Sequence, residues 1–103
     1  MTDDEQAKRC AKMLSAIAEP HRIRIIECLR AKSMNVTQLA QELEMEIVNV
    51  SHHLSVMRDA GLVEFDKEGR FVNYSLHPKV FHNDSNKTTF VELGWCRVEI
   101  PHN

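Results

Sequence analysis

Residues 37–61, TQLAQELEMEIVNVSHHLSVMRDAG, decide the fold of this chain. Thr37 can cap a short helix that runs through residue 43 and turns one apolar face inward, formed by Leu39, Ala40 and Leu43. After a brief break, a second helix of about residues 47–60 carries an apolar stripe at helical spacing and ends before Gly61, with Ile47, Val50, Leu54 and Met57 in the stripe. Two short helices joined by a tight turn form a helix-turn-helix.

Two helices are predicted before this pair and a hairpin after it. Thr2 and Glu5 fit a capping box that opens an amphipathic helix, with Ala7, Cys10, Ala11, Leu14, Ile17 and Ala18 on its apolar face. Pro20 suits the first turn of another helix, residues 20–31, which we expect to be buried on several sides. Beyond Gly61 the spacing of apolar residues changes from about 3.6 residues to 2. This change predicts a β-hairpin with its turn at residues 66–70.

The C-terminal tail departs from this pattern. Residues 83–87 read as a polar loop, and residues 88–100 are rich in β-branched and aromatic side chains. A change of phase beside Gly94 predicts a single bulged strand, with Trp95 as the side chain that anchors it.

Length and composition predict one folded domain over residues 1–103, with a core of residues 1–80 and a tail of residues 81–103 that serves in dimer formation or packing. The chain has 103 residues, of which 43% are hydrophobic and 27% charged. The longest stretch without Asp, Glu, Lys or Arg, residues 47–57, is far shorter than the roughly 20 residues of a membrane span. No secretory signal is evident, so we expect a cytoplasmic protein without a membrane partner. A formal charge of −2 argues against non-specific coating of nucleic acid.

Five segments, taken in order and spacing, resemble the ArsR/SmtB family of bacterial transcriptional repressors. They are LSAIAEPHRIRII at 14–26, VSHHL at 50–54, AGLV at 60–63, EGR at 68–70 and YSL at 74–76. The resemblance implies a homodimeric winged helix-turn-helix that represses an operon until a small inducer binds. We therefore expect a mainly α fold with a small β-hairpin wing (α+β), and a β-like tail in place of the final helix usual in the family.

In such a fold the second helix of the pair enters the major groove of duplex DNA, and the wing touches the backbone. The outward positions of that helix offer base-edge and phosphate contacts, whereas His53 lies beside the apolar stripe and is expected to be packed and hydrogen-bonded. A two-fold dimer predicts an imperfect palindromic operator. The predicted DNA-binding residues are Thr37, Gln38, Val48, Asn49, Ser51, His52, Ser55 and Arg58, with Lys67 and Arg70 on the wing.

The predicted DNA face departs from the family in its charge. Glu44 stands in the turn where relatives commonly have glycine, and Glu46 precedes the recognition helix, where a carboxylate repels phosphate. Residues 51–79 hold four basic and four acidic side chains. We therefore expect a modest, salt-sensitive affinity for DNA or an unusual operator.

The sequence does not identify the inducer. Arsenic-sensing relatives carry a C-x-C pair where this chain has Asn35 and Thr37, and the C-terminal helix that holds zinc in other relatives is not predicted. We therefore assign no cofactor and no metal site, with metal binding left open. Cys10 and Cys96 form a hypothetical thiol sensor if the tail packs on the first helix. The alternative is that Cys10, Cys28 and Cys96 are small buried hydrophobic residues, and Cys28 is expected to lie in the core.

Other function classes are less well supported. No catalytic residue order and no glycine-rich phosphate loop occurs, so an enzyme is not expected. The alternative to a DNA-binding regulator is a winged-helix module that binds another protein through the apolar tail or the surface of Ile47 and Val48. The acidic overall charge, with Glu44 and Glu46, favours this alternative.

Overall fold

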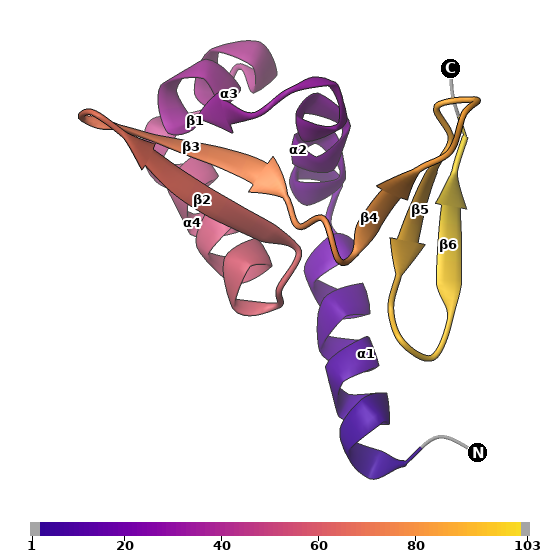
Figure 1. Cartoon of the computed structure of the whole chain (residues 1–103). Helices are drawn as coiled ribbons and strands as arrows, with labels where there is room; N and C mark the ends of the chain where they lie inside the picture. Colours follow the sequence, from indigo (N-terminus) through magenta and orange to yellow (C-terminus); the bar gives the residue numbers. More distant parts are fainter. Residues whose placement is uncertain (1–2, 102–103) are drawn as a thin grey trace.

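Four helices and two small antiparallel sheets make up residues 3–101, the part of the chain that the computed structural model describes (Figure 1). The helices are α1 (Asp4–Ile17), α2 (Pro20–Ala31), α3 (Val36–Leu43) and α4 (Ile47–Asp59). Two longer strands, β2 (Val63–Glu68) and β3 (Phe71–Leu76), form the wing. The predicted α+β winged helix-turn-helix is confirmed.

Each of the first two helices follows a residue whose side chain caps its first turn. Asp3 caps α1, and its carboxylate accepts a hydrogen bond from the N–H of Gln6 at 2.7 Å. The predicted cap at Thr2 is therefore wrong, and Thr2 itself lies outside the described residues. Pro20 is the first residue of α2, as predicted, because its fixed φ suits the first helical turn and Glu19 supplies the cap.

A reciprocal capping box opens α3. The side chain of Asn35 accepts from the N–H of Gln38 at 2.8 Å, and the Gln38 side chain accepts from the N–H of Asn35 at 2.9 Å. The predicted cap at Thr37 is wrong, because the backbone is extended at Asn35 and already helical two residues later. Thr37 lies exposed in the first turn of α3.

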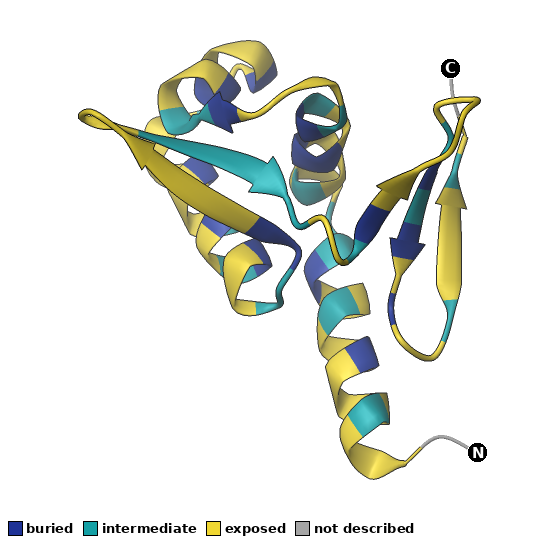
Figure 2. Ribbon diagram, viewed as in Figure 1, coloured by how far each residue is buried: buried dark blue, intermediate teal, exposed yellow. Residues whose placement is uncertain are grey.

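The core lies between α2, α3 and α4 (Figure 2). Val50, Leu54 and Met57 of α4 are fully buried, as predicted. Ile47 is 53% exposed, which contradicts the prediction that it belongs to this stripe. It is the first residue of α4 and lies beyond the edge of the core. The inward face of α3 is confirmed, with Leu39, Ala40 and Leu43 all buried.

The first two helices are less buried than their sequences suggest. Of the predicted α1 stripe, Cys10 is buried and Ile17 half-buried, whereas the remaining members, Leu14 among them, are exposed. In α2, Ile23 is 53% exposed, and Cys28 is half-buried at the edge of the core, not inside it as predicted. These positions are exposed because α1 extends away from the body formed by the other helices (Figure 1).

The wing belongs to a three-stranded sheet of order β1-β3-β2. Its first strand, β1 (Met34–Asn35), pairs with β3 and was not predicted, because two residues carry no recognisable period. The antiparallel register of β2 and β3 continues to a tight turn at Gly69 and Arg70, where Gly69 has a φ of 65°. The predicted turn at residues 66–70 was therefore too long.

The C-terminal tail forms a sheet of its own, of order β4-β5-β6. Its strands are β4 (Phe81–Asn83), β5 (Thr89–Glu92) and β6 (Arg97–Ile100), and successive strands are antiparallel. The predicted bulged strand over residues 88–100 is wrong. Gly94, with a φ of 87°, lies in the turn of a hairpin, so the change of apolar phase marks a reversal of the chain.

Arg30 of α2 ties this sheet to the helices. Its Nε donates to the Thr89 hydroxyl at 2.9 Å, and its Nη1 pairs with Glu27 at 3.0 Å. The Thr89 hydroxyl in turn donates to the Asn83 side chain at 2.7 Å, so one guanidinium group joins α2 to two neighbouring strands. The Arg30 side chain is only 12% exposed, which keeps these bonds partly away from water.

Apolar side chains hold the inner face of the tail. Phe81, Val91 and Leu93 are buried in the common core. Trp95 is 63% exposed, so the prediction that it anchors the tail is wrong. It lies in the β5–β6 connection beside α1, where nothing in residues 3–101 covers most of its ring.

Candidate nucleic-acid interface

The turn between α3 and α4 carries two carboxylates and a strained backbone. Glu44 adopts the left-handed backbone conformation, with φ 54° and ψ 49°, which residues other than glycine and asparagine seldom adopt. Glu46 is the N-cap of α4 but makes no side-chain hydrogen bond to the helix. Glu44 and Glu46, the two residues that depart from the family pattern, therefore both lie at the amino-terminal end of α4.

The outward face of α4 presents the side chains that the sequence predicts. Val48 is 73% exposed, and the other predicted members on this helix are exposed as well, namely Asn49, Ser51, His52, Ser55 and Arg58. Thr37 and Gln38 are exposed on α3. The Gln38 carbonyl oxygen is already used in the capping box, so only its amide group is free to donate.

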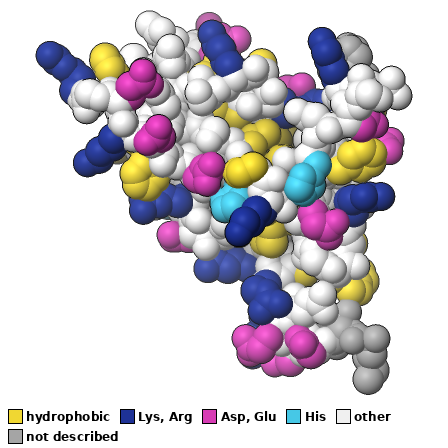
Figure 3. Space-filling model, in the orientation of Figure 1, with side chains coloured by type: hydrophobic (Ala, Val, Ile, Leu, Met, Phe, Trp, Pro, Cys, Tyr) yellow, Lys and Arg dark blue, Asp and Glu magenta, His cyan; other side chains and the backbone are white. Residues whose placement is uncertain are grey.

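The wing carries charges of both signs. Lys67 and Arg70 are exposed near its tip, where basic and acidic side chains lie interleaved on the surface (Figure 3). Glu68 accepts a hydrogen bond from the Asn73 side chain at 3.0 Å, and since this amide is neutral the carboxylate keeps its negative charge. The guanidinium carbon of Arg58 lies 4.2 Å from the centre of the Phe65 ring, so α4 and β2 hold this cation between them.

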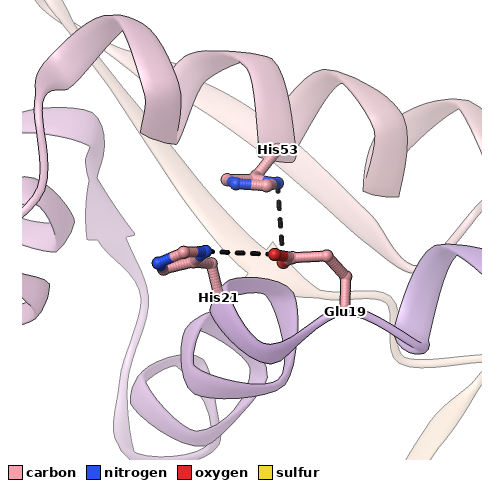
Figure 4. A group of neighbouring side chains, drawn as sticks. All are labelled: Glu19, His21 and His53. Atoms are coloured by element: carbon pink, nitrogen blue, oxygen red, sulfur yellow. Dashed lines mark hydrogen bonds and ion pairs between the residues drawn. The ribbon is translucent and has the colours of Figure 1, made fainter.

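Behind the recognition helix, Arg22 fixes the joint between α1 and α2. Its Nε donates to the Ala16 carbonyl at 2.6 Å, and its Nη1 donates to Nδ1 of His53 on α4 at 3.3 Å. His53 also stacks on His21, with ring centres 5.5 Å apart, and the Glu19 carboxylate lies beside both rings (Figure 4). The predicted packed, hydrogen-bonded role of His53 is confirmed.

Charge and burial set the protonation of this cluster. Burial lowers the pKa of His53, and Arg22 adds to that effect while Glu19 opposes it. Partial burial also opposes ionisation of Glu19, but the N–H of Arg22 and the rings of His21 and His53 outweigh it and lower the pKa of this carboxyl group. Because Nδ1 of His53 accepts from Arg22, the 3.8 Å separation from Glu19 is not an ion pair.

The sequence and the fold are similar to those of known transcription regulators. The family described as "Bacterial regulatory protein, arsR family" matches residues 19–64. The regulator NmtR of Mycobacterium tuberculosis is 43% identical over 75 residues, which are 73% of this chain and 62% of NmtR. The transcriptional repressor PagR of Bacillus anthracis is 32% identical, with a TM-score of 0.68 over 76% of this chain and 91% of PagR. This chain belongs to the arsR family.

The family consists of transcription regulators and not of enzymes, in agreement with the sequence. The arsR-family chain is also similar to the homodimeric winged helix-turn-helix DNA-binding domain Mb0332 of Mycobacterium bovis. There the identity is 25% and the TM-score 0.70, over 76% of this chain and 75% of that domain. The chain spans less than two thirds of the length of NmtR. Among residues 3–101, no helix is both long and apolar enough to cross a membrane.

The two predicted sensor thiols of this arsR-family chain lie together. Cys10 is buried on α1, and Cys96 is half-buried just before β6, close enough to Cys10 for that thiol to affect its pKa. Burial, and then the neighbouring Cys10 thiol, raises the pKa of Cys96. The sequence therefore predicted the contact correctly, but the raised pKa makes Cys96 less reactive than an ordinary thiol at neutral pH.

An apolar surface runs from α1 to the C-terminal sheet. Leu14 is 37% exposed and lines two neighbouring hollows, one beside Trp95 and one between Ile23 and Val98. These four side chains therefore form one continuous exposed patch, which we call the apolar face. Exposed apolar patches of this kind mark contact sites in soluble proteins.

Sequence reasoning missed the roles of Glu19, His21 and Arg22. They stand in the EPHR stretch that contributes to the family resemblance, yet no periodic pattern places them opposite residue 53. Only the crossing of α2 and α4 brings them to His53.

Proposed function

We propose that this chain is a homodimeric repressor that binds duplex DNA sequence-specifically and is released by an effector. The observation that carries the proposal is the outward face of α4. Its amide, hydroxyl and imidazole side chains are exposed on a helix whose other side is fully buried. A rigid helix with hydrogen-bonding groups on one side suits the major groove, where base pairs present distinct donor and acceptor patterns.

In this proposal Asn49, Ser51 and His52 read base edges, and Val48 contacts a thymine methyl group. Arg58 and the wing's Lys67 and Arg70 contact phosphates. The remaining predicted contacts, Thr37, Gln38 and Ser55, position the two helices on the backbone. Two subunits related by a two-fold axis would place their α4 helices in successive major grooves of an imperfect palindrome.

The apolar face supports the homodimer. It combines side chains of α1, α2 and the C-terminal sheet, and Trp95 and Leu14 are large apolar groups that a second copy would cover. Mb0332, which shares this fold, is a homodimer. Dimer formation also makes a palindromic operator useful, because both half-sites are then bound together.

The test is fluorescence anisotropy with labelled duplex DNA from upstream of the gene, in the presence of a scrambled competitor. We expect specific binding that Asn49→Ala weakens by roughly 30-fold or more, because the dimer loses one base contact of about 1–3 kcal/mol in each half-site. Asn86→Ala, in the exposed loop before β5, is the matched control and leaves affinity unchanged. Lys67→Ala and Arg70→Ala each remove one phosphate contact from both subunits of the dimer, so each lowers the slope of log affinity against log salt by about two.

A winged-helix module that binds a protein is the second candidate. Ile47 and Val48 favour it, because both are apolar and more than half exposed at the start of α4. The same titration separates the two functions. Absence of specific DNA binding at low salt would reject the repressor and leave the protein-binding module.

A further inference from the structure

Three potential metal ligands converge where the joint between α1 and α2 meets the recognition helix. Glu19, His21 and His53 each place one ligand atom within 4.8 Å of the other two, the one such group of three among residues 3–101 (Figure 4). We propose that these three residues bind a divalent transition-metal ion of borderline softness, such as Zn²⁺, Co²⁺ or Ni²⁺. Imidazole nitrogen and carboxylate oxygen are donors that such ions accept.

The spacing of the ligand atoms fits such an ion. Nδ1 of His21 lies 3.0 Å from Oε1 of Glu19, and Nδ1 of His53 lies 3.8 Å from Oε2. A tetrahedral ion with bonds of about 2.0–2.1 Å holds its ligand atoms about 3.3 Å apart. The two separations go to different oxygens of the Glu19 carboxylate, and all three ligand atoms lie within 4.8 Å of one another, so an ion requires side-chain rotations to bring them to this spacing.

The exposure of the ligands also suits metal binding. The His53 side chain is 14% exposed and the His21 side chain 48%. The site is therefore anchored on its inner side and open to water on its outer side, which leaves a position for a solvent ligand.

Arg22 limits the affinity of this site. Its Nη1 lies 3.3 Å from the Nδ1 of His53 that would bind the ion, so binding must displace that contact. The guanidinium group stays close, because its Nε remains bonded to the Ala16 carbonyl. A nearby positive charge disfavours a cation, and we therefore expect weaker binding than in a closed four-ligand zinc site.

A bound metal ion would link the start of α2 to α4. Glu19 and His21 lie at the start of α2, and His53 lies on α4 behind the outward face that carries His52. An ion held by all three would fix the orientation of α4 relative to α2 without covering the proposed DNA contacts. The site is distinct from residues 35 and 37, where the sequence lacks the cysteine pair of arsenic-sensing relatives.

The experiment is a Co²⁺ titration of the untagged full chain, under reducing conditions and without DNA. We expect one Co²⁺ per chain, with the visible ligand-field bands of tetrahedral Co²⁺ and no intense thiolate-to-cobalt charge-transfer band. Removal of a side chain that merely supports a metal ligand costs 10- to 100-fold in affinity, so His21→Ala, which removes a ligand, weakens binding at least tenfold. His82→Ala, at an exposed histidine on β4, is the matched control and leaves binding unchanged.

Glu19→Gln keeps an acceptor for the N–H of Arg22 while removing the charge, and it weakens Co²⁺ binding at least tenfold as well. If this variant unfolds, His21→Ala decides alone, because the His21 side chain is 48% exposed and lies outside the hydrophobic core. Three results would overturn the proposal: no Co²⁺ uptake, unchanged affinity in His21→Ala, or an intense thiolate band. None of these readouts depends on DNA binding, so the experiment tests the metal site independently of the repressor function.

Discussion

At the scale of single residues, Glu46 is the position where helix stability and DNA binding make opposite demands. Its charge suits the amino-terminal end of α4, but its side chain makes no cap bond and lies where phosphate would approach. We predict that Glu46→Ser stabilises the protein by about 0.5–1 kcal/mol, because a serine hydroxyl at the N-cap accepts from the first-turn N–H groups. The free energy of unfolding in urea measures this gain, and anisotropy should show tighter DNA binding.

Glu46→Gln separates the two effects. It removes the charge without adding a short cap acceptor, so it should tighten DNA binding and leave the free energy of unfolding unchanged or slightly lower. Weaker DNA binding in either variant would contradict the position assigned to Glu46 beside phosphate.

Cys96 provides a prediction on pH. Its pKa is raised by burial and by Cys10, so a smaller fraction is thiolate at neutral pH than in a free cysteine, and that fraction grows only as pH rises through the raised pKa. Alkylation by iodoacetamide, followed for each cysteine by peptide mass spectrometry, should be slow for Cys96 at pH 7 and accelerate at alkaline pH. Cys10→Ser should shift the midpoint downward.

The same measurement bears on the proposed thiol sensor. If Cys96 reacts at pH 7 as fast as a free thiol, the raised pKa is refuted and oxidative release of DNA becomes the favoured effector response. If DNA release by a mild oxidant is the same in the parent and in Cys10→Ser and Cys96→Ser variants, the thiol pair has no sensing role.

At the scale of elements, local chemistry determined which predictions succeeded. Pro20 predicted the start of α2 correctly, because the proline ring fixes the backbone angle φ in any sequence context. Thr37 failed as the cap of α3 because Asn35, a residue of the same capping class, had the partner Gln38 three residues ahead. The same logic applies to Gly94: glycine is compatible with a bulge and with a turn, and only the pairing of β5 with β6 distinguishes them.

The candidate functional site also contains residues that the sequence predicted and residues that it did not. The exposed residues of α4 follow from helical period alone, because Val50, Leu54 and Met57 define the buried side. The cluster of Glu19, His21 and His53 could not be predicted, because it depends on how two helices cross and not on any local pattern.

Arg30 determines how the C-terminal sheet is attached to α2. We predict that Arg30→Lys destabilises the protein by about 1.5–3 kcal/mol, because one ammonium group cannot replace a planar fork that bonds Thr89 and Glu27 together. Urea unfolding measures the loss, and hydrogen exchange should show faster opening of β5 amides. Arg24→Lys, at an exposed position on the same helix, is the control and should change stability by less than about 0.5 kcal/mol. Equal stability of the parent and Arg30→Lys would show that apolar packing alone holds the sheet.

At the scale of the whole molecule, the two sheets lie on different sides of the helices and serve different surfaces (Figure 1). The wing extends the proposed DNA face, whereas the C-terminal sheet extends α1 and carries half of the apolar face. A dimer formed through that face leaves both wings and both α4 helices available to DNA. In such a dimer the tail would take the place that the family resemblance gives to a final helix.

Trp95 allows this arrangement to be tested directly, because it is the single tryptophan of the chain. In a dimer formed through the apolar face its ring is covered, so we predict that dilution shifts its fluorescence to longer wavelength as subunits separate. Leu14→Glu should weaken the dimer by about thirtyfold or more, since burial of a charge at the centre of an interface costs at least 2 kcal/mol. Sedimentation equilibrium measures this change, with Phe71→Ser, at an exposed apolar position on the wing, as the control. A dimer that Leu14→Glu leaves intact while Phe71→Ser dissociates it would place the interface on the wing, and the α4 helices could not then occupy successive grooves.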